Sequence, residues 1–283
     1  MMMTTTDAGT DAGVPVERGP KALPLDGDGN GLWWDAPTST LYIADDQNNR
    51  ILKYRDGEGI SLAANLPMAP PNGPGLGGLV LKPDGTLVVT RFGGGTYGEV
   101  VYVKTDGTGA GVVPNIPKDR RRIGLALASD GTLYDTYFVR INNVNVGSVA
   151  RLDIAAGAET EVVGGMVKPV GLALTSDTMF ITDQTANKLY RTPLANPSTL
   201  TTVVDVTEPD LLARGPNDSL LSGSRSNGVL QFSSSGTQSV FQGGFQQVRG
   251  VAWDEQNRRV FAVDHDGDMS NGTTHFLQII PVP

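Results

Sequence analysis

The feature that most constrains this chain is an internal repeat that occurs six times along its 283 residues. Each copy has a short apolar segment, which begins near a glycine in five of the six copies, then a turn, then a second segment rich in β-branched and aromatic residues. The first copy spans Asn30–Asp35 and Leu41–Asp45, and the last spans Arg249–Trp253 and Val260–Asp264. The second positions of the copies are residues 31, 78, 124, 171, 211 and 250.

Successive copies are therefore 47, 46, 47, 40 and 39 residues apart, which is the length of a four-stranded propeller blade. The sequence predicts an all-β fold, a six-bladed β-propeller, with inner strands that start near residues 30, 77, 123, 170, 210 and 249. The sixth copy reaches Pro283 after only three strands. We therefore expect the segment from Val16 to Leu25 to supply the outer strand of blade six and to close the ring, which removes an exposed sheet edge.

Composition limits the classes of function. The formal charge of −8 disfavours nucleic-acid binding, and the absence of cysteine excludes thiol nucleophiles and disulfides. No apolar run is long enough to span a membrane. The one basic cluster, Lys118 to Arg122, is predicted to be a solvated loop.

The N-terminus is small and polar, and residues 1–15 are predicted to be a disordered tail or a lipoprotein tether that precedes the propeller at 16–283. The tether hypothesis places the protein in the periplasm or on the cell surface, as a monomer. A plain disordered tail remains the alternative.

In a propeller, the start of each first strand and the end of each second strand lie on the same face. At the first-strand starts, Asn30, Asp210 and Arg249 form a polar side, while Ile123 and Val170 make the opposite wall apolar. A pocket with one polar and one apolar side suits a small-molecule ligand. The second-strand ends add predicted substrate-binding residues on the rim: Asp45, Arg91, Tyr137 and Asp183.

Three residues are candidates for catalysis: Asp210, Arg249 and His265. Only two histidines occur in the chain, and His265 falls on the predicted site face, where it can act as a general base. His275 opens a strand and is predicted to be structural. The alternative for Asp210 and Arg249 is a structural ion pair.

Alternating carboxylates at Asp264, Asp266 and Asp268 make a candidate calcium loop, with a solvated polar loop as the alternative. The segment Asp26–Gly31 also begins like a calcium loop, but its twelfth position is Pro37, which cannot provide the last ligand.

Two sets of motifs resemble known proteins. The segments Asn30–Asp35 and Gly78–Gly85 resemble the senescence-marker-protein/gluconolactonase superfamily of six-bladed propellers, and Ala44–Ile51 and Thr182–Leu189 resemble NHL repeats. The resemblance implies hydrolysis of lactones or phosphoesters around a divalent cation held at the first-strand starts.

Carried over position by position, those cation ligands fall on Asn30, Gly77, Ile123 and either Val170 or Asp210. Because only Asn30 and Asp210 have oxygen in their side chains, we predict no metal at the channel centre and no cofactor, with calcium restricted to an outer loop.

The sequence thus predicts an exported propeller that binds or transforms a small molecule at the top of its central channel. It leaves open whether the chain is an enzyme; if it is one, it is a lactonase-like or esterase-like hydrolase. A strictosidine-synthase-like propeller is also open. The alternative from a different class is an NHL-like scaffold that binds a protein or a glycan on its top face.

Overall fold

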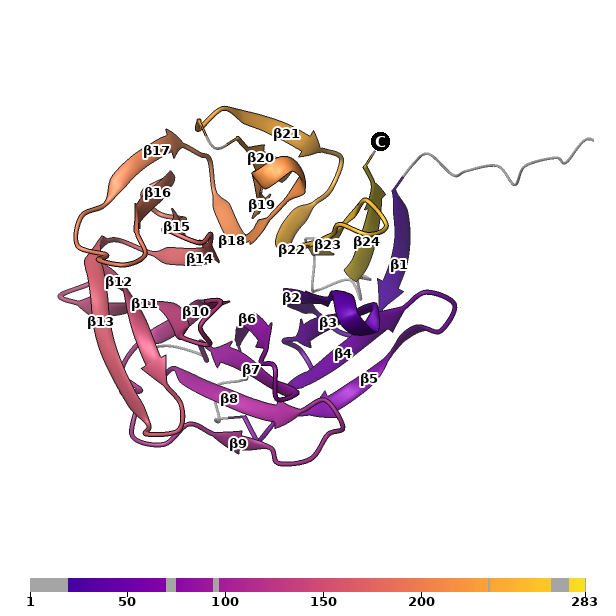
Figure 1. The fold of residues 1–283 in the computed structure, drawn as a ribbon, viewed down its shortest axis with the longest axis horizontal. Coiled ribbons are helices and arrows are strands. Elements are labelled where there is room, and N and C mark those ends of the chain that lie inside the picture. Colours follow the sequence, from indigo (N-terminus) through magenta and orange to yellow (C-terminus); the bar gives the residue numbers. More distant parts are fainter. Residues whose placement is uncertain (1–19, 70–74, 94–96, 234, 266–274, 283) are drawn as a thin grey trace, which may run out of the picture.

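The structure, a computed structural model, describes residues 20–69, 75–93, 97–233, 235–265 and 275–282. Within these ranges the chain forms six four-stranded antiparallel sheets arranged as blades around a central axis (Figure 1). The predicted six-bladed β-propeller is therefore confirmed. The tail predicted over 1–15 and two residues of the candidate calcium loop, Asp266 and Asp268, lie outside the described residues.

Within each blade the strands follow one another outward from the channel. The first three blades are β2 (Gly29–Asp35), β3 (Thr40–Asp45), β4 (Arg50–Arg55) and β5 (Gly59–Asn65); β6 (Leu76–Leu81), β7 (Thr86–Arg91), β8 (Glu99–Lys104) and β9 (Gly111–Val112); and β10 (Arg121–Leu127), β11 (Leu133–Ile141), β12 (Val144–Asp153) and β13 (Ala158–Met166). The next two are β14 (Pro169–Leu174), β15 (Thr178–Asp183), β16 (Lys188–Pro193) and β17 (Thr201–Asp205); and β18 (Pro209–Arg214), β19 (Leu220–Ser224), β20 (Gly228–Phe232) and β21 (Gln238–Gln242). The described helices are the short 3₁₀ turns η1 (Ala36–Thr38) and η2 (Pro216–Asp218).

The sixth blade joins the two ends of the chain. It consists of β22 (Gln247–Asp254), β23 (Arg259–His265), β24 (His275–Pro281) and, outermost, β1 (Lys21–Leu25), as Figure 1 shows. The register pairs Leu25 with His275 and Leu23 with Leu277. The predicted closure of the ring by an N-terminal outer strand is confirmed for the described part of that segment.

The apolar core lies between neighbouring blades rather than in one central mass. Strand side chains alternate between the two faces of each sheet, so every blade buries apolar residues against both neighbours. Between blades six and one, for example, Leu41, Phe261 and Leu277 are fully buried. The rings of Trp34 and Phe261 meet there with centroids 5.3 Å apart.

The glycines that mark the repeat allow the inner strands to converge on the axis. A Cβ atom added to Gly31 would lie 2.2 Å from the carbonyl oxygen of Gly77, and one added to Gly250 would lie 2.0 Å from that of Asn30. Non-bonded atoms do not approach this closely, so a side chain at either position would push two blades apart. Glycine is therefore required at these positions for close backbone approach.

We expect Gly250→Ala to destabilise the fold by about 3 kcal/mol, because the added methyl group forces blade six away from blade one. Equilibrium urea unfolding measures this change. The control is Gly243→Ala, whose added Cβ would have no heavy atom nearer than 3.8 Å and should change stability by less than ~0.5 kcal/mol. Equal unfolding midpoints for the two variants would contradict this account of the repeat glycines.

Candidate functional site

Every inner strand has a register irregularity at the same end. The pairing between the first and second strands of each blade shifts at residues 29/32, 76/79, 122/125, 169/171, 209/212 and 248/251. Bulges of this kind re-aim side chains and are frequent beside binding sites. Five of the residues at the bulges line a common cavity: Asn30, Ile123, Val170, Asp210 and Arg249.

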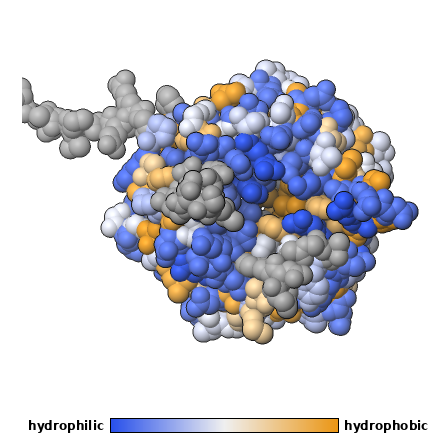
Figure 2. Space-filling model, turned by 180° about the vertical axis from the view of Figure 1, so that it is seen from behind, coloured by the Kyte–Doolittle hydropathy of each residue, from blue (hydrophilic) through white to orange (hydrophobic). Residues whose placement is uncertain are grey.

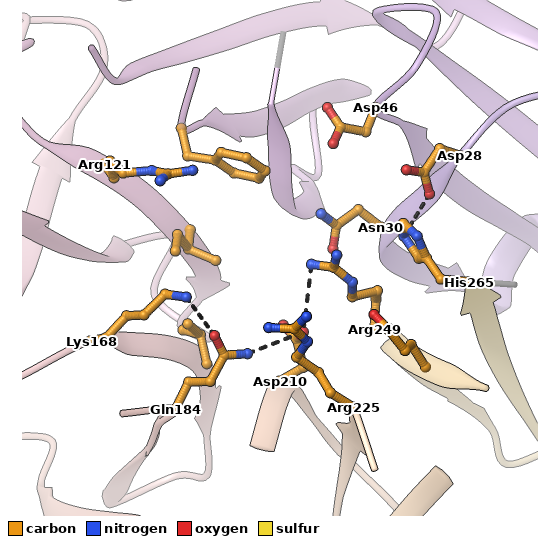
Figure 3. A pocket seen from close by; sticks show the side chains of 14 residues that line it. Asp28, Asn30, Asp46, Arg121, Lys168, Gln184, Asp210, Arg225, Arg249 and His265 are labelled. Carbon is orange, nitrogen blue, oxygen red and sulfur yellow. Dashed lines mark hydrogen bonds and ion pairs between the residues drawn. The ribbon is translucent and has the colours of Figure 1, made fainter. Parts of the chain in front are cut away.

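The cavity has a volume of about 420 Å³, which is the size of a small-molecule site. Its wall is completed by residues two positions before those at the bulge and by residues at or directly after the ends of second strands (Figure 3). The first of these sets is Asp28, Arg121, Lys168 and Gln247, and the second is Asp46, Phe92, Gln184, Arg225 and His265. The structure thus brings Asn30, Asp210, Arg249 and His265 together, as the sequence predicted.

The other four predicted site residues do not line the cavity. Asp45 and Asp183 are buried and cap backbone N–H groups instead of standing on the rim. The Asp45 carboxylate accepts a hydrogen bond from the N–H of Asp28 at 3.0 Å. That of Asp183 accepts from the N–H groups of Val167 and Lys168 at 2.7 and 3.0 Å. These carboxylates hold the segment that leads into each inner strand.

Arg91 and Tyr137 are buried in side-chain pairs away from the cavity. Arg91 is fully buried and donates to Glu99 Oε2 at 2.9 Å. The Tyr137 hydroxyl donates to Glu161 Oε2 at 2.6 Å. Their placement on the rim was wrong, and the predicted substrate-binding role of all four residues loses its geometric basis.

For Asp45, Arg91 and Asp183 the error is one residue of register, because the next residue in each case lines the cavity. Successive side chains of a strand point to opposite faces, so a shift of one position exchanges a cavity residue for a buried one. In four blades the residue that faces the cavity follows the last residue of the second strand, and in blade six it is the last residue of β23: Asp46, Phe92, Gln184, Arg225 and His265.

Basic side chains gather in the cavity of this acidic chain. Four cations, Arg121, Lys168, Arg225 and Arg249, share the wall with three carboxylates. Burial lowers the pKa of Lys168; Asp210 opposes this shift, whereas three neighbouring guanidinium groups reinforce it. Burial also lowers the pKa of Arg121. Like charges are therefore crowded here, and an anion would relieve the crowding.

Two of these cations are without a carboxylate partner among the described residues. Neither Arg121 nor Arg225 forms an ion pair there, and the Arg121 guanidinium lies 5.1 Å from the centroid of the Phe92 ring. The cluster from Lys118 to Arg122 is not the solvated loop that the sequence predicted: Arg122 is fully buried against Asp135, at 2.5 Å.

Asp210 and Arg249 form a loose ion pair, with 3.7 Å between Asp210 Oδ2 and Arg249 Nη1 (Figure 3). Asp210 is buried, and this burial raises the pKa of its carboxyl group even though Arg249 acts in the opposite direction. Asn30 donates its side-chain amide to the carbonyl of Leu76 at 2.7 Å, which fixes its orientation at the cavity edge.

Asp46 provides another carboxyl group with a raised pKa. Burial raises the pKa of Asp46 to about 6, although its hydrogen bond from the N–H of Leu76 acts against the shift. Asp46 lies on the same side of the cavity as Asp28 (Figure 3).

Both histidines of the chain lie at this side. His265 Nε2 is 2.6 Å from Asp28 Oδ1, and the rings of His265 and His275 meet edge to face with centroids 4.8 Å apart. One ligand atom from each of Asp28, His265 and His275 lies within 4.8 Å of the others. Asp264, from the candidate calcium loop, instead accepts hydrogen bonds from the N–H groups of Gln246 and Gln247.

Hydrophilic side chains crowd around the centre of one face of the molecule (Figure 2). No helix among the described residues is long and apolar enough to cross a membrane. The structure is thus a six-bladed propeller with a cavity lined by charged residues at the starts of its inner strands.

Comparison with known proteins places the fold. No protein-family model matches the chain, and no curated protein matches its sequence. Solved six-bladed propellers of the gluconolactonase type share its architecture, as the sequence motifs predicted.

A gluconolactonase from Xanthomonas campestris is 17% identical, with a TM-score of 0.72 over 93% of this chain and 90% of the other. A luciferin-regenerating enzyme is also 17% identical, with a TM-score of 0.70 over 93% and 96%. The calcium-binding protein regucalcin from Agrobacterium tumefaciens is 13% identical, with a TM-score of 0.68 over 90% and 92%. At these sequence identities, the structural similarity shows a shared fold and does not show a shared function.

Proposed function

We propose that the cavity binds an anionic small molecule and hydrolyses a lactone or ester bond within it. The observation that carries the proposal is the excess of cations over carboxylates in the cavity of a chain whose overall charge is −8. Arg121 and Arg225 are free to pair with a ligand, and guanidinium groups bind carboxylates with paired, charge-assisted hydrogen bonds. An anion bound there would offset the repulsion among the crowded cations.

The walls suit a ligand with two unlike ends. Phe92, Ile123 and Val170 line one side and can contact a carbon skeleton. On the opposite side Arg249 can orient a carbonyl oxygen. The short contact between Asp28 and His265 places a base next to the space where a water molecule would attack that carbonyl.

The gluconolactonase-like fold raises the question of a central calcium ion, and the ring residues fit one poorly. Calcium takes six to eight oxygen ligands, and Ile123, Val170 and Arg249 offer none from their side chains. The Arg249 guanidinium lies where it would repel a cation held by Asp210. The proposed hydrolysis therefore includes no step through calcium at the channel centre.

Paired ligands test the proposal. Each pair consists of a lactone that carries a free carboxylate and the methyl ester of that carboxylate. The two compounds differ mainly in the negative charge of this group. We expect the acids to raise the melting temperature of the protein and to be hydrolysed, and the neutral esters to bind at least tenfold more weakly. Turnover is followed by pH-stat titration with and without EDTA.

Two outcomes would contradict the proposal. Equal binding of acids and esters would show that the cations of the cavity do not contribute to ligand binding. Binding of acids with no hydrolysis across the panel would leave an anion-binding propeller and remove the enzymatic part.

A further inference from the structure

We propose that Asp28, His265 and His275 form a binding site for a divalent transition metal ion, with Zn²⁺ as the best match. The three residues come from distant parts of the chain: Asp28 precedes β2, His265 ends β23 and His275 begins β24. Closure of the ring brings blade six against blade one and so assembles the group.

The strongest evidence is the state of the three atoms that face one another. Asp28 Oδ1, His265 Nε2 and His275 Nδ1 are all buried, and no hydrogen bond is formed by any of them in the part of the chain that is described; the first two contact only each other, as an ion pair at 2.6 Å. A buried polar atom without a partner is costly, and a metal ion shared with the Asp28–His265 pair, whose ligand atoms lie within 4.8 Å of His275 Nδ1, would supply that partner. Asp28 and His275 are only 7% and 5% exposed.

The donor set selects the kind of ion. Two imidazole nitrogens and one carboxylate oxygen suit zinc, whereas calcium prefers oxygen ligands alone. Tetrahedral ligands at about 2.1 Å from zinc lie roughly 3.4 Å apart. The present separations, from 2.6 Å to at most 4.8 Å, require shifts of about 1 Å in the side chains, a small rotation of each ring.

Three protein ligands leave a fourth position open, which is typical of catalytic rather than structural zinc. Asp28 and His265 line the cavity, so the open position faces the proposed ligand site. A metal-bound water there would be a hydrolytic nucleophile, and the metal would then replace the Asp28–His265 pair as the group that activates water, because His265 Nε2 would be coordinated. This role depends on the proposed function; the binding of the metal does not.

The test measures metal binding in the full-length, tag-free protein after EDTA treatment. Competition with a chromogenic chelator should show one equivalent of Zn²⁺, with no displacement by a hundredfold excess of Ca²⁺. Asp28→Asn and His275→Gln should each weaken zinc binding at least tenfold. The matched control is Asp46→Asn, which removes a neighbouring carboxylate charge and should change zinc affinity less than threefold.

A second measurement requires no variant. The chain has only two histidines, so ¹⁵N-histidine labelling reports on this site alone. Zinc should shift the resonances of His265 Nε2 and His275 Nδ1 together. Absence of zinc uptake, uptake that leaves both imidazoles unchanged, or displacement by Ca²⁺ would overturn the site. Stoichiometric zinc binding without hydrolysis of any panel compound would support the metal site and count against the proposed activity.

Discussion

Removal of residues 1–25 is expected to lower the melting temperature by roughly 10 °C or to cause aggregation, because blade six loses its outer strand. Strand β1 pairs with β24 from Lys21 opposite Ile279 to Leu25 opposite His275. Its loss uncovers Leu277, which is now fully buried, and exposes the edge of β24 to other chains. Thermal unfolding followed by circular dichroism, with light scattering, measures both effects.

The matched control removes only residues 1–13. This deletion ends before β1 and should leave the melting temperature within about 1 °C of the full-length value. Equal melting temperatures for both deletions, without aggregation, would show that closure of the ring by β1 contributes little to stability.

The sequence was sufficient to predict the ring because propeller blades repeat. Six copies at spacings of 39 to 47 residues, five of them marked by a glycine, predict six blades, and the short sixth copy predicts closure by the N-terminal strand. Both inferences depend on counting rather than on side-chain geometry. They therefore do not change when a strand boundary is misplaced by one residue.

The site was harder to predict because it depends on such boundaries. The inner-strand residues Asn30, Asp210 and Arg249 were found because each first strand starts at the same position of the repeat, where the structure has a bulge. The second-strand residues were misplaced by one, and alternation of side chains turned that slip into a change of face for Asp45 and Asp183.

The cationic wall was missed for a related reason. Arg121, Lys168 and Arg225 lie in connecting segments or at strand ends, where the repeat has no fixed pattern. The available signal was positional: Arg121 and Lys168 lie two residues before a bulge position, as Asp28 does. The metal-site hypothesis likewise required the structure, since the sequence assigned His275 a structural role and did not place it beside Asp28 and His265.

Arg249→Ala is expected to weaken binding of an anionic ligand at least tenfold while destabilising the fold by only about 2 kcal/mol. Loss of a buried ion-pair partner ordinarily costs more, since the other charge remains unpaired. Here Lys168 and Arg225 also act electrostatically on Asp210, so its carboxylate keeps cationic neighbours. Ligand titration calorimetry and urea unfolding measure the two quantities separately.

Three further variants separate a ligand-binding role for Arg249 from a structural one. Arg249→Lys keeps the charge but not the planar pair of donors, and should bind with intermediate affinity. Arg214→Ala removes an exposed arginine paired with Asp218 at 3.1 Å, and should change neither quantity. The double variant Arg249→Ala/Asp210→Asn removes the pair together and should recover stability. If ligand binding also recovers in that double variant, or never falls in Arg249→Ala, the pair is structural and Arg249 does not bind the ligand.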